Sequence, residues 1–204
     1  MLRIGLTGGI AGGKTEAAAF LRELGAEIVS ADEIYRDLVR PGGPVLRAIE
    51  AEFGPEVLTA NGALDRKKLS AIVFGDPTEL ARLDAVARAP LTEAVLARIE
   101  ELERDRPQGV VVVEAAILLE WGILDLFDVI VVVRAPRDVR VERLRKAGLS
   151  ETEALARIAS QASEEAFVGA ADVIIENDSS LAELRTKILG LWTSLRNKKG
   201  GRVR

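Results

Sequence analysis

The distribution of apolar residues along the chain predicts short buried strands connected by amphipathic helices. Five short segments are dominated by consecutive apolar residues, and they cover residues 3–7, 27–30, 110–113, 128–133 and 172–175. Strands of this kind are buried on both faces, which is typical of parallel sheets covered by helices. Helical spacing predicts helices over residues 14–24, 31–39, 136–146, 151–161 and 179–195. The pattern therefore indicates an α/β fold with a parallel sheet.

The central part of the chain, residues 44–106, has no convincing strand pattern. It predicts helices over residues 45–53, 65–73, 78–88 and 91–105, with breaks at Gly54-Pro55, Gly75-Asp76-Pro77 and Pro90. We expect one domain over residues 1–204, with a core of about residues 1–40 and 107–204. The helical insertion between them, about residues 41–106, is where we expect a substrate to bind.

Glycines gather directly after the first predicted strand. Residues 8–15 read Gly-Gly-Ile-Ala-Gly-Gly-Lys-Thr and match G-x-x-x-x-G-K-[ST], the P-loop. Glycines allow backbone N–H groups to converge on phosphate oxygens, and the following helix adds its dipole. Lys14 would reach the β- and γ-phosphates of ATP, and Thr15 would bind Mg²⁺. The alternative is a flexible glycine turn with an incidental lysine, but the strand–turn–helix context favours a P-loop.

Two carboxylates follow predicted strands. Asp32 comes two residues after the second strand, near the edge where open α/β sheets carry their sites, and would orient or deprotonate an attacking hydroxyl. Asp32 also fits an ordinary helix start, since Ser30 and Asp32 are both favoured there. Glu114 ends the four-valine strand, where P-loop proteins often hold Mg²⁺ with an acid. A solvent-facing acid at the strand end is the alternative for Glu114.

Composition narrows the chemistry. The chain has no cysteine and no histidine, so thiolate catalysis, histidine triads and histidine metal sites are excluded, and any general base is a carboxylate or a lysine. A net charge of −4 argues against a dedicated nucleic-acid binder, and no apolar run approaches membrane-spanning length. We expect a cytoplasmic monomer with no nucleic-acid or membrane partner. The tail, residues 196–204, holds five basic side chains and no acid, and we expect it to be a disordered end.

A basic stretch follows the fourth predicted strand. Arg137, Arg140 and Arg143 recur every third residue and share a helix face. Such a face would close over a polyphosphate and neutralise charge in the transition state. The alternative is a solvated helix in which these arginines pair with Asp138 and Glu142.

Beyond the P-loop, the chain resembles the dephospho-CoA kinase family over nearly its whole length. The matching segments are Gly5-Leu6-Thr7-Gly8-Gly9-Ile10, Ala31-Asp32, Gly62-Ala63-Leu64-Asp65-Arg66-Lys67-Lys68-Leu69, Ile72-Val73-Phe74, Leu118-Leu119-Glu120, Arg157 with Gln161, and Ala171-Asp172-Val173-Ile174 with Asn177 and Leu184. The insertion motif and the last of these segments make the match specific, because the P-loop alone indicates only a nucleotide-binding fold.

The resemblance implies transfer of the γ-phosphoryl group of ATP to the ribose 3′-hydroxyl of dephospho-CoA with Mg²⁺. It implies a P-loop fold similar to nucleoside monophosphate kinases, with a lid within about residues 136–165. The implied catalytic residues are Lys14, Asp32 and Arg143. The residues that the resemblance implies for binding the nucleotide are Gly8, Gly9, Ala11, Gly12, Gly13, Lys14, Thr15, Glu16, Arg140 and Asn177. The implied metal ligands are Thr15 and Glu114. Asp32, Asp65 and Arg66 would bind dephospho-CoA.

Several positions depart from the family pattern. Glu16 stands where the family has Ser or Thr, Ala89 replaces a histidine before Pro90, and an arginine is missing before Gly148-Leu149. The last change leaves open which lid cation covers the γ-phosphate. Two other functions stay open: a P-loop kinase for another small hydroxyl acceptor, and a nucleotide-dependent switch without useful turnover.

Overall fold

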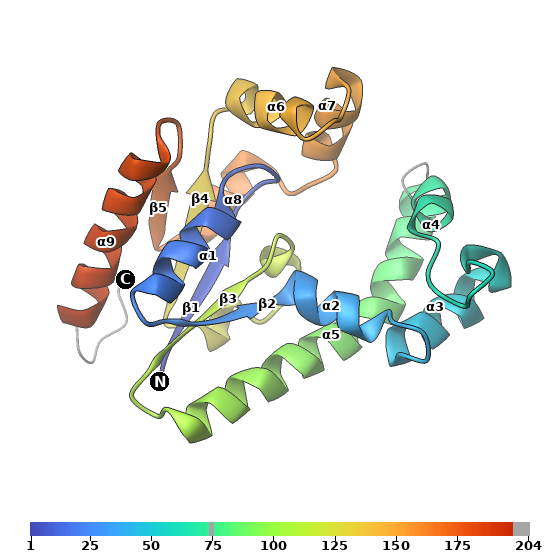
Figure 1. The fold of residues 1–204 in the computed structure, drawn as a ribbon, viewed down its shortest axis with the longest axis horizontal. Helices are drawn as coiled ribbons and strands as arrows, with labels where there is room; N and C mark the ends of the chain where they lie inside the picture. The colour runs from blue at the N-terminus through green and yellow to red at the C-terminus, as the bar shows by residue number, and fades with distance from the viewer. Residues whose placement is uncertain (74–75, 198–204) are drawn as a thin grey trace. The chain divides into compact units, whose positions relative to one another are not determined.

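The computed structural model describes residues 1–73 and 76–197 and contains a five-stranded sheet (Figure 1). The strands are β1 (Leu2–Thr7), β2 (Glu27–Ser30), β3 (Val110–Glu114), β4 (Val129–Arg134) and β5 (Val173–Glu176). They lie in the order β2-β3-β1-β4-β5, and β1 pairs in parallel with both β3 and β4. The parallel α/β fold expected from the sequence is confirmed. The expected break at Gly75, Phe74 of the family motif, and tail residues 198–204 lie outside the described residues.

Helices connect the strands. They are α1 (Lys14–Glu23), α2 (Ala31–Leu38), α3 (Pro44–Phe53), α4 (Arg66–Val73), α5 (Pro77–Asp105), α6 (Arg137–Lys146), α7 (Glu151–Ala159), α8 (Glu164–Ala170) and α9 (Leu181–Asn197), with 3₁₀ turns η1 (Pro55–Val57), η2 (Leu118–Glu120) and η3 (Leu124–Leu126). Serine side chains cap four of the helices: Ser30 caps α2, Ser150 forms a capping box with Glu153 at α7, Ser163 caps α8 and Ser180 caps α9. No helix among the described residues is long and apolar enough to cross a membrane.

The chain divides into two compact units. The first contains Met1–Val29 and the residues from Glu101 onward, and the second is Ser30–Glu100. The second unit therefore begins earlier and ends earlier than the insertion expected at about residues 41–106.

Helices α1 and α9 lie side by side and cover one face of the sheet in the first unit (Figure 1). The fully buried side chains of Ile4 and Leu21 belong to the core formed there with Ile188 of α9. On the other face, Gly5 lets neighbouring side chains approach β1 closely. A Cβ at Gly5 would lie only 2.7 Å from Leu118 Cδ2. This face therefore has no room for a side chain at that position.

The second unit has its own apolar core. Its buried members are Val39, Val45, Ile49, Phe53, Val57, Leu69, Val73 and Ala87. They come from α3, α4, α5 and the segments that follow α2 and α3, so the helical part of the chain packs around a core of its own.

Helix α5 runs unbroken through Pro90, so the predicted separation into two helices at this residue is wrong. Proline inside a helix removes a hydrogen bond and costs about 3 kcal/mol. Ala87, Leu91, Val95 and Ile99 are buried at intervals of four residues on both sides of the proline. Each large aliphatic side chain contributes about 1.5–3 kcal/mol when buried, so this continuous stripe outweighs the cost of the proline.

Helix α8 was not predicted from the sequence. This helix has only 7 residues, which is too short for an apolar period to stand out.

Candidate active site

The predicted P-loop joins the end of β1 to the start of α1 and has an irregular backbone. Three of its residues have positive φ: Gly8 at 141°, Ala11 at 58° and Gly13 at 105°. Ala11 is the only residue other than glycine with positive φ in the described part of the chain. Gly13 precedes α1 and has no side chain to accept from the first amides of that helix. These amides and the helix dipole form a site suited to an anion.

Neighbouring backbone and side chains explain why the loop is rich in glycine. A Cβ at Gly8 would collide with the Val133 carbonyl oxygen, and one at Gly13 would collide with the Asn177 amide. A Cβ at Gly9 would overlap the Arg140 guanidinium. The glycines are therefore needed for packing as well as for phosphate access.

Lys14 lies across the loop that precedes it. Its Nζ donates to the carbonyl oxygens of Gly8 at 2.9 Å and Gly9 at 3.2 Å. The ammonium group is thereby held beside the start of α1, where the anion site is formed.

Thr15 and Glu114, the two expected metal ligands, lie together. The Thr15 hydroxyl donates to Glu114 Oε1 at 2.9 Å. The contact arises because β1 and β3 are neighbours, with Leu6 paired to Glu114 at the carboxyl end of the sheet. Hydroxyl and carboxylate oxygens suit Mg²⁺, which usually keeps several waters and substrate oxygens as its other ligands. The described residues contain no group of three or more acidic, histidine or cysteine side chains that would hold a metal by themselves.

Arg140 and Arg143 of α6 do not lie on a solvated face, which was one of the two expectations for this helix. Arg140 is only 5% exposed, and its guanidinium bonds to Ile10 O at 2.9 Å and to Glu164 Oε1 at 2.6 Å. Burial lowers the pKa of Arg140, while the nearby carboxylate of Glu164 opposes this shift. Arg143 donates to Ala11 O at 3.0 Å. Both arginines thus hold backbone carbonyls of the P-loop.

Asn177, expected on the nucleotide side, also contacts the P-loop. Its amide Nδ2 donates to Gly12 O at 2.8 Å, and the residue is only 3% exposed. The backbone carbonyl oxygen of Asn177 accepts from Arg143 Nη2 at 2.9 Å. Asn177, Arg143 and the loop therefore form one connected network.

Two residues of this network were not assigned a role from the sequence. Gln161 Oε1 accepts from the Ile10 N–H at 2.6 Å, and Glu164 pairs with Arg140. Gln161 stood out only as part of a family motif, and Glu164 carried no signal at all. Both lie more than a hundred residues from the loop along the chain, so local patterns do not connect them with it.

The other candidates belong to the second unit. Asp32 is exposed in the first turn of α2, where the cap is Ser30, whose hydroxyl oxygen accepts from Glu33 N at 3.4 Å. Asp65 Oδ1 accepts from the backbone N–H groups of Lys67 and Lys68, both at 3.1 Å, and so caps the start of α4. The roles of Asp32 and Asp65 toward a substrate stay predictions.

Arg66 is exposed at the first position of α4. Its charge influences Tyr35: burial raises the pKa of the Tyr35 hydroxyl, Arg66 lowers it and Asp84 raises it. Arg66, Tyr35 and Asp84 therefore share one electrostatic environment in the second unit. The role of Arg66 toward dephospho-CoA stays a prediction.

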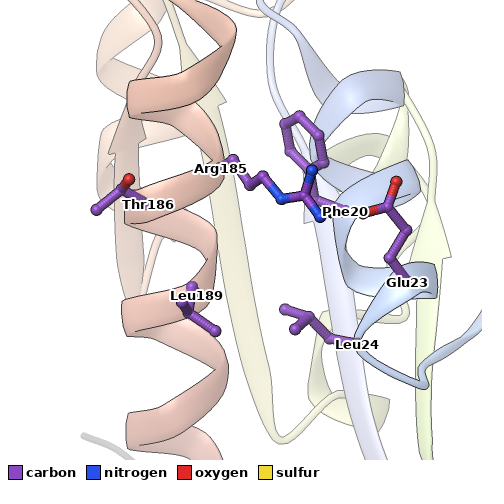
Figure 2. Close-up of a pocket in the computed structure, with 6 residues that line it drawn as sticks. All are labelled: Phe20, Glu23, Leu24, Arg185, Thr186 and Leu189. Carbon is purple, nitrogen blue, oxygen red and sulfur yellow. Dashed lines mark hydrogen bonds and ion pairs between the residues drawn. The ribbon is translucent and has the colours of Figure 1, made fainter.

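A separate groove of about 240 Å³ lies between α1 and α9 (Figure 2). It is lined by Phe20, Glu23, Leu24, Arg185, Thr186 and Leu189. Arg185 pairs with Glu23 at 2.8 Å and stacks over the Phe20 ring at 5.5 Å. The lining residues on α1 belong to its C-terminal half, whereas the P-loop precedes its N-terminus, so this groove does not contain the expected phosphate site.

Comparison with known proteins agrees with the P-loop that these residues form and identifies the family. A family model described as dephospho-CoA kinase matches residues 2–183. A dephospho-CoA kinase from Anaeromyxobacter dehalogenans is 44% identical over 203 residues, covering 98% of this chain and 95% of the relative. One from Streptomyces avermitilis is 43% identical over 197 residues, covering 96% of this chain and 94% of the relative.

Solved structures share the fold of this chain, and one of them is a dephospho-CoA kinase. Protein TT1252 from Thermus thermophilus has a TM-score of 0.79 at 30% identity and covers 98% of each chain. A dephospho-CoA kinase from Campylobacter jejuni has a TM-score of 0.71 at 25% identity, covering 97% of this chain and 98% of its own. A shikimate kinase from Acinetobacter baumannii, solved with shikimate, reaches 0.54 at 18% identity, covering 98% of this chain and 96% of its own, and shows the fold alone.

Proposed function

The chain belongs to the dephospho-CoA kinase family, and on this premise we propose that it transfers the γ-phosphoryl group of ATP to the ribose 3′-hydroxyl of dephospho-CoA, giving coenzyme A and ADP. One structural observation supports the phosphoryl-transfer part: at the start of α1, Lys14 is anchored to the P-loop backbone, and the next residue, Thr15, donates to Glu114. Phosphoryl transfer requires positioned cations and N–H donors more than covalent chemistry, and this arrangement supplies both.

In this proposal the P-loop binds the β- and γ-phosphates of ATP. The backbone amides at the start of α1 would donate to phosphate oxygens, and Lys14 would neutralise charge that grows on the γ-phosphoryl group in a loose transition state. The anchoring of Lys14 to Gly8 and Gly9 supports this role, because a cation already held in the loop loses little freedom when the nucleotide binds.

The residues present fit a magnesium ion. We assign Thr15 as a direct ligand and Glu114 as the acid that holds the hydrated ion, since their oxygens lie 2.9 Å apart at the edge of the sheet. Bound there, Mg²⁺ would neutralise the β- and γ-phosphate oxygens.

On the acceptor side, Asp32 is our proposed base. Its carboxylate would accept a hydrogen bond from the 3′-hydroxyl, orient it for in-line attack and take its proton late in the transfer. Its exposure leaves it accessible to a substrate, and in a chain without histidine a carboxylate is the natural group for this task. Asp65 and Arg66 would bind the remainder of dephospho-CoA, with Arg66 as the cation for its phosphates.

Arg143 would stabilise the transition state. Its guanidinium donates to Ala11 O, so its positive charge is held at the P-loop, where it would offset negative charge on the transferred phosphoryl group. Arg140 and Asn177 would support the nucleotide through their bonds to the loop. As part of the same proposal, the enzyme acts as a cytoplasmic monomer with no nucleic-acid or membrane partner.

The test is a coupled ADP-release assay with ATP and Mg²⁺. We expect turnover that depends on dephospho-CoA and is absent with shikimate, with adenosine or without an acceptor. Turnover with another hydroxyl acceptor alone would replace the proposed substrate. Tight nucleotide binding without turnover on any acceptor would favour a switch.

A further inference from the structure

Four side chains hold four successive peptide groups of the P-loop from outside. Arg140, Arg143 and Asn177 each donate to a carbonyl oxygen, and these belong to Ile10, Ala11 and Gly12 in turn. Gln161 differs from the other three, because its Oε1 accepts from a backbone N–H, that of Ile10. Of the two ends of the Gln161 side-chain amide, only the oxygen can accept from an N–H, so Oε1 and not Nε2 faces Ile10.

The Gly9–Ile10 peptide is therefore turned opposite to the three that follow it. In a planar trans peptide the N–H and the C=O point in opposite directions. Because the Ile10 N–H points out to Gln161, the Gly9 carbonyl points into the loop. There it accepts from Lys14 Nζ at 3.2 Å and from Gly12 N at 3.0 Å.

The local sequence alone does not fix this orientation of the Gly9–Ile10 peptide. Gly9 permits many backbone conformations, so the peptide after it is free to turn unless something holds it. Ala11, two residues on, has a φ of 58°, a left-handed conformation that is unfavourable for a residue other than glycine. A loop in such an unfavourable conformation is stable only when several contacts from the surrounding structure hold it.

We propose that Gln161 is a positioning residue for Lys14: by holding the Ile10 N–H, it sets the direction of the Gly9 carbonyl that anchors the lysine ammonium. Gln161 acts through the backbone and touches neither substrate in this role. The inference rests on the proposed function only for its kinetic consequences, since nucleotide binding tests it without any acceptor.

Two substitutions separate the hydrogen bond from the bulk of the side chain. Gln161→Met keeps the length but removes the acceptor, whereas Gln161→Glu keeps an oxygen that accepts from the Ile10 N–H. The matched control is Glu165→Gln, an exposed position in the first turn of α8. Affinity for a non-hydrolysable ATP analogue is measured by calorimetry, together with kcat, both KM values and the melting temperature.

We expect Gln161→Met to weaken binding of the analogue about tenfold, the factor that corresponds to losing the one hydrogen bond that holds the Gly9–Ile10 peptide in its binding orientation. The KM for dephospho-CoA and the melting temperature should stay close to those of the original protein. Gln161→Glu should recover most of the lost affinity, and Glu165→Gln should change none of these values. Should Gln161→Met fail to fold, Gln161→Asn, one methylene too short to reach Ile10, carries the same prediction.

Unchanged nucleotide affinity in Gln161→Met, or equal losses in the Met and Glu variants, would overturn the inference. A lower melting temperature with both KM values raised equally would indicate a purely structural role and would also overturn it. If the original protein binds the analogue but does not turn over dephospho-CoA, the proposed substrate is wrong while the affinity comparison still decides the role of Gln161.

Discussion

The Thr15 hydroxyl donates to the Glu114 carboxylate across neighbouring strands, with 2.9 Å between the two oxygens. The two residues lie 99 positions apart in the chain, and only the pairing of β1 with β3 brings them together. This pair, next to the anchored Lys14, is the part of the molecule from which nucleotide chemistry follows most directly.

Lys14→Ala should abolish turnover and leave the fold intact. Lys14 is only half-buried in a glycine loop, so its removal creates no core cavity, but it removes the cation expected on the γ-phosphate. We expect a fall in kcat/KM of about 10³-fold or more, with an unchanged circular-dichroism melting curve. Lys146→Ala, which removes an exposed lysine paired with Glu142, is the control and should retain full activity. Near-normal turnover in Lys14→Ala would refute the P-loop assignment.

Glu114→Gln should shift the Mg²⁺ dependence of the rate to higher concentration. The amide keeps the size of the side chain but loses the charge that would hold the hydrated ion beside Thr15. A titration of rate against Mg²⁺ measures the shift, and saturating Mg²⁺ should restore most of the rate. The exposed Asp125→Asn serves as control. An unchanged Mg²⁺ dependence in Glu114→Gln would mean that Glu114 does not hold the metal and that its bond to Thr15 is structural.

Asp32→Asn should retain ATP binding and lose most of kcat. The substitution keeps the size of the side chain and removes both its charge and its affinity for the acceptor proton. A positioned base typically contributes about 10²-fold or more to the rate, and Mg²⁺ should not restore it. Asp37→Asn changes another exposed acid of α2, paired with Arg40, and should be silent. If high Mg²⁺ rescues Asp32→Asn but not Glu114→Gln, the two roles are reversed.

Arg66→Ala should raise the KM for dephospho-CoA far more than the KM for ATP. Arg66 is exposed at the start of α4, so its loss should not disturb the core of the second unit. Steady-state kinetics with each substrate varied in turn gives the two values. Lys67→Ala, the adjacent exposed cation, tests whether charge alone is responsible. Equal changes in both KM values, or none, would mean that this region does not bind the acceptor.

The sequence predicted the parts of the molecule that depend on local patterns. The buried strands, the P-loop between β1 and α1, and the positions of Thr15 and Glu114 at the ends of a turn and a strand follow from short stretches of chain. The break at Pro90 was wrong because tertiary burial along α5 outweighs the local preference of proline.

The support of the P-loop could not be predicted in the same way. The bond from Ile10 to Gln161 joins residues 151 positions apart, and that from Arg140 to Glu164 depends on α8, a helix too short to recognise. The arginines of α6 were identified as a basic face, but that they hold carbonyl oxygens of the loop depends on tertiary structure alone. Whether Asp32 and Arg66 act on a substrate is the part that the kinetic tests decide.

The most direct test of the central claim is the identity of the product. Purified protein is incubated with ATP, Mg²⁺ and dephospho-CoA, and the products are followed by ³¹P nuclear magnetic resonance and mass spectrometry, with Lys14→Ala as the inactive control. We expect one ADP for each coenzyme A formed, with the new phosphomonoester on the ribose 3′-oxygen. ADP and inorganic phosphate without a modified acceptor, or a phosphate at another hydroxyl, would contradict it.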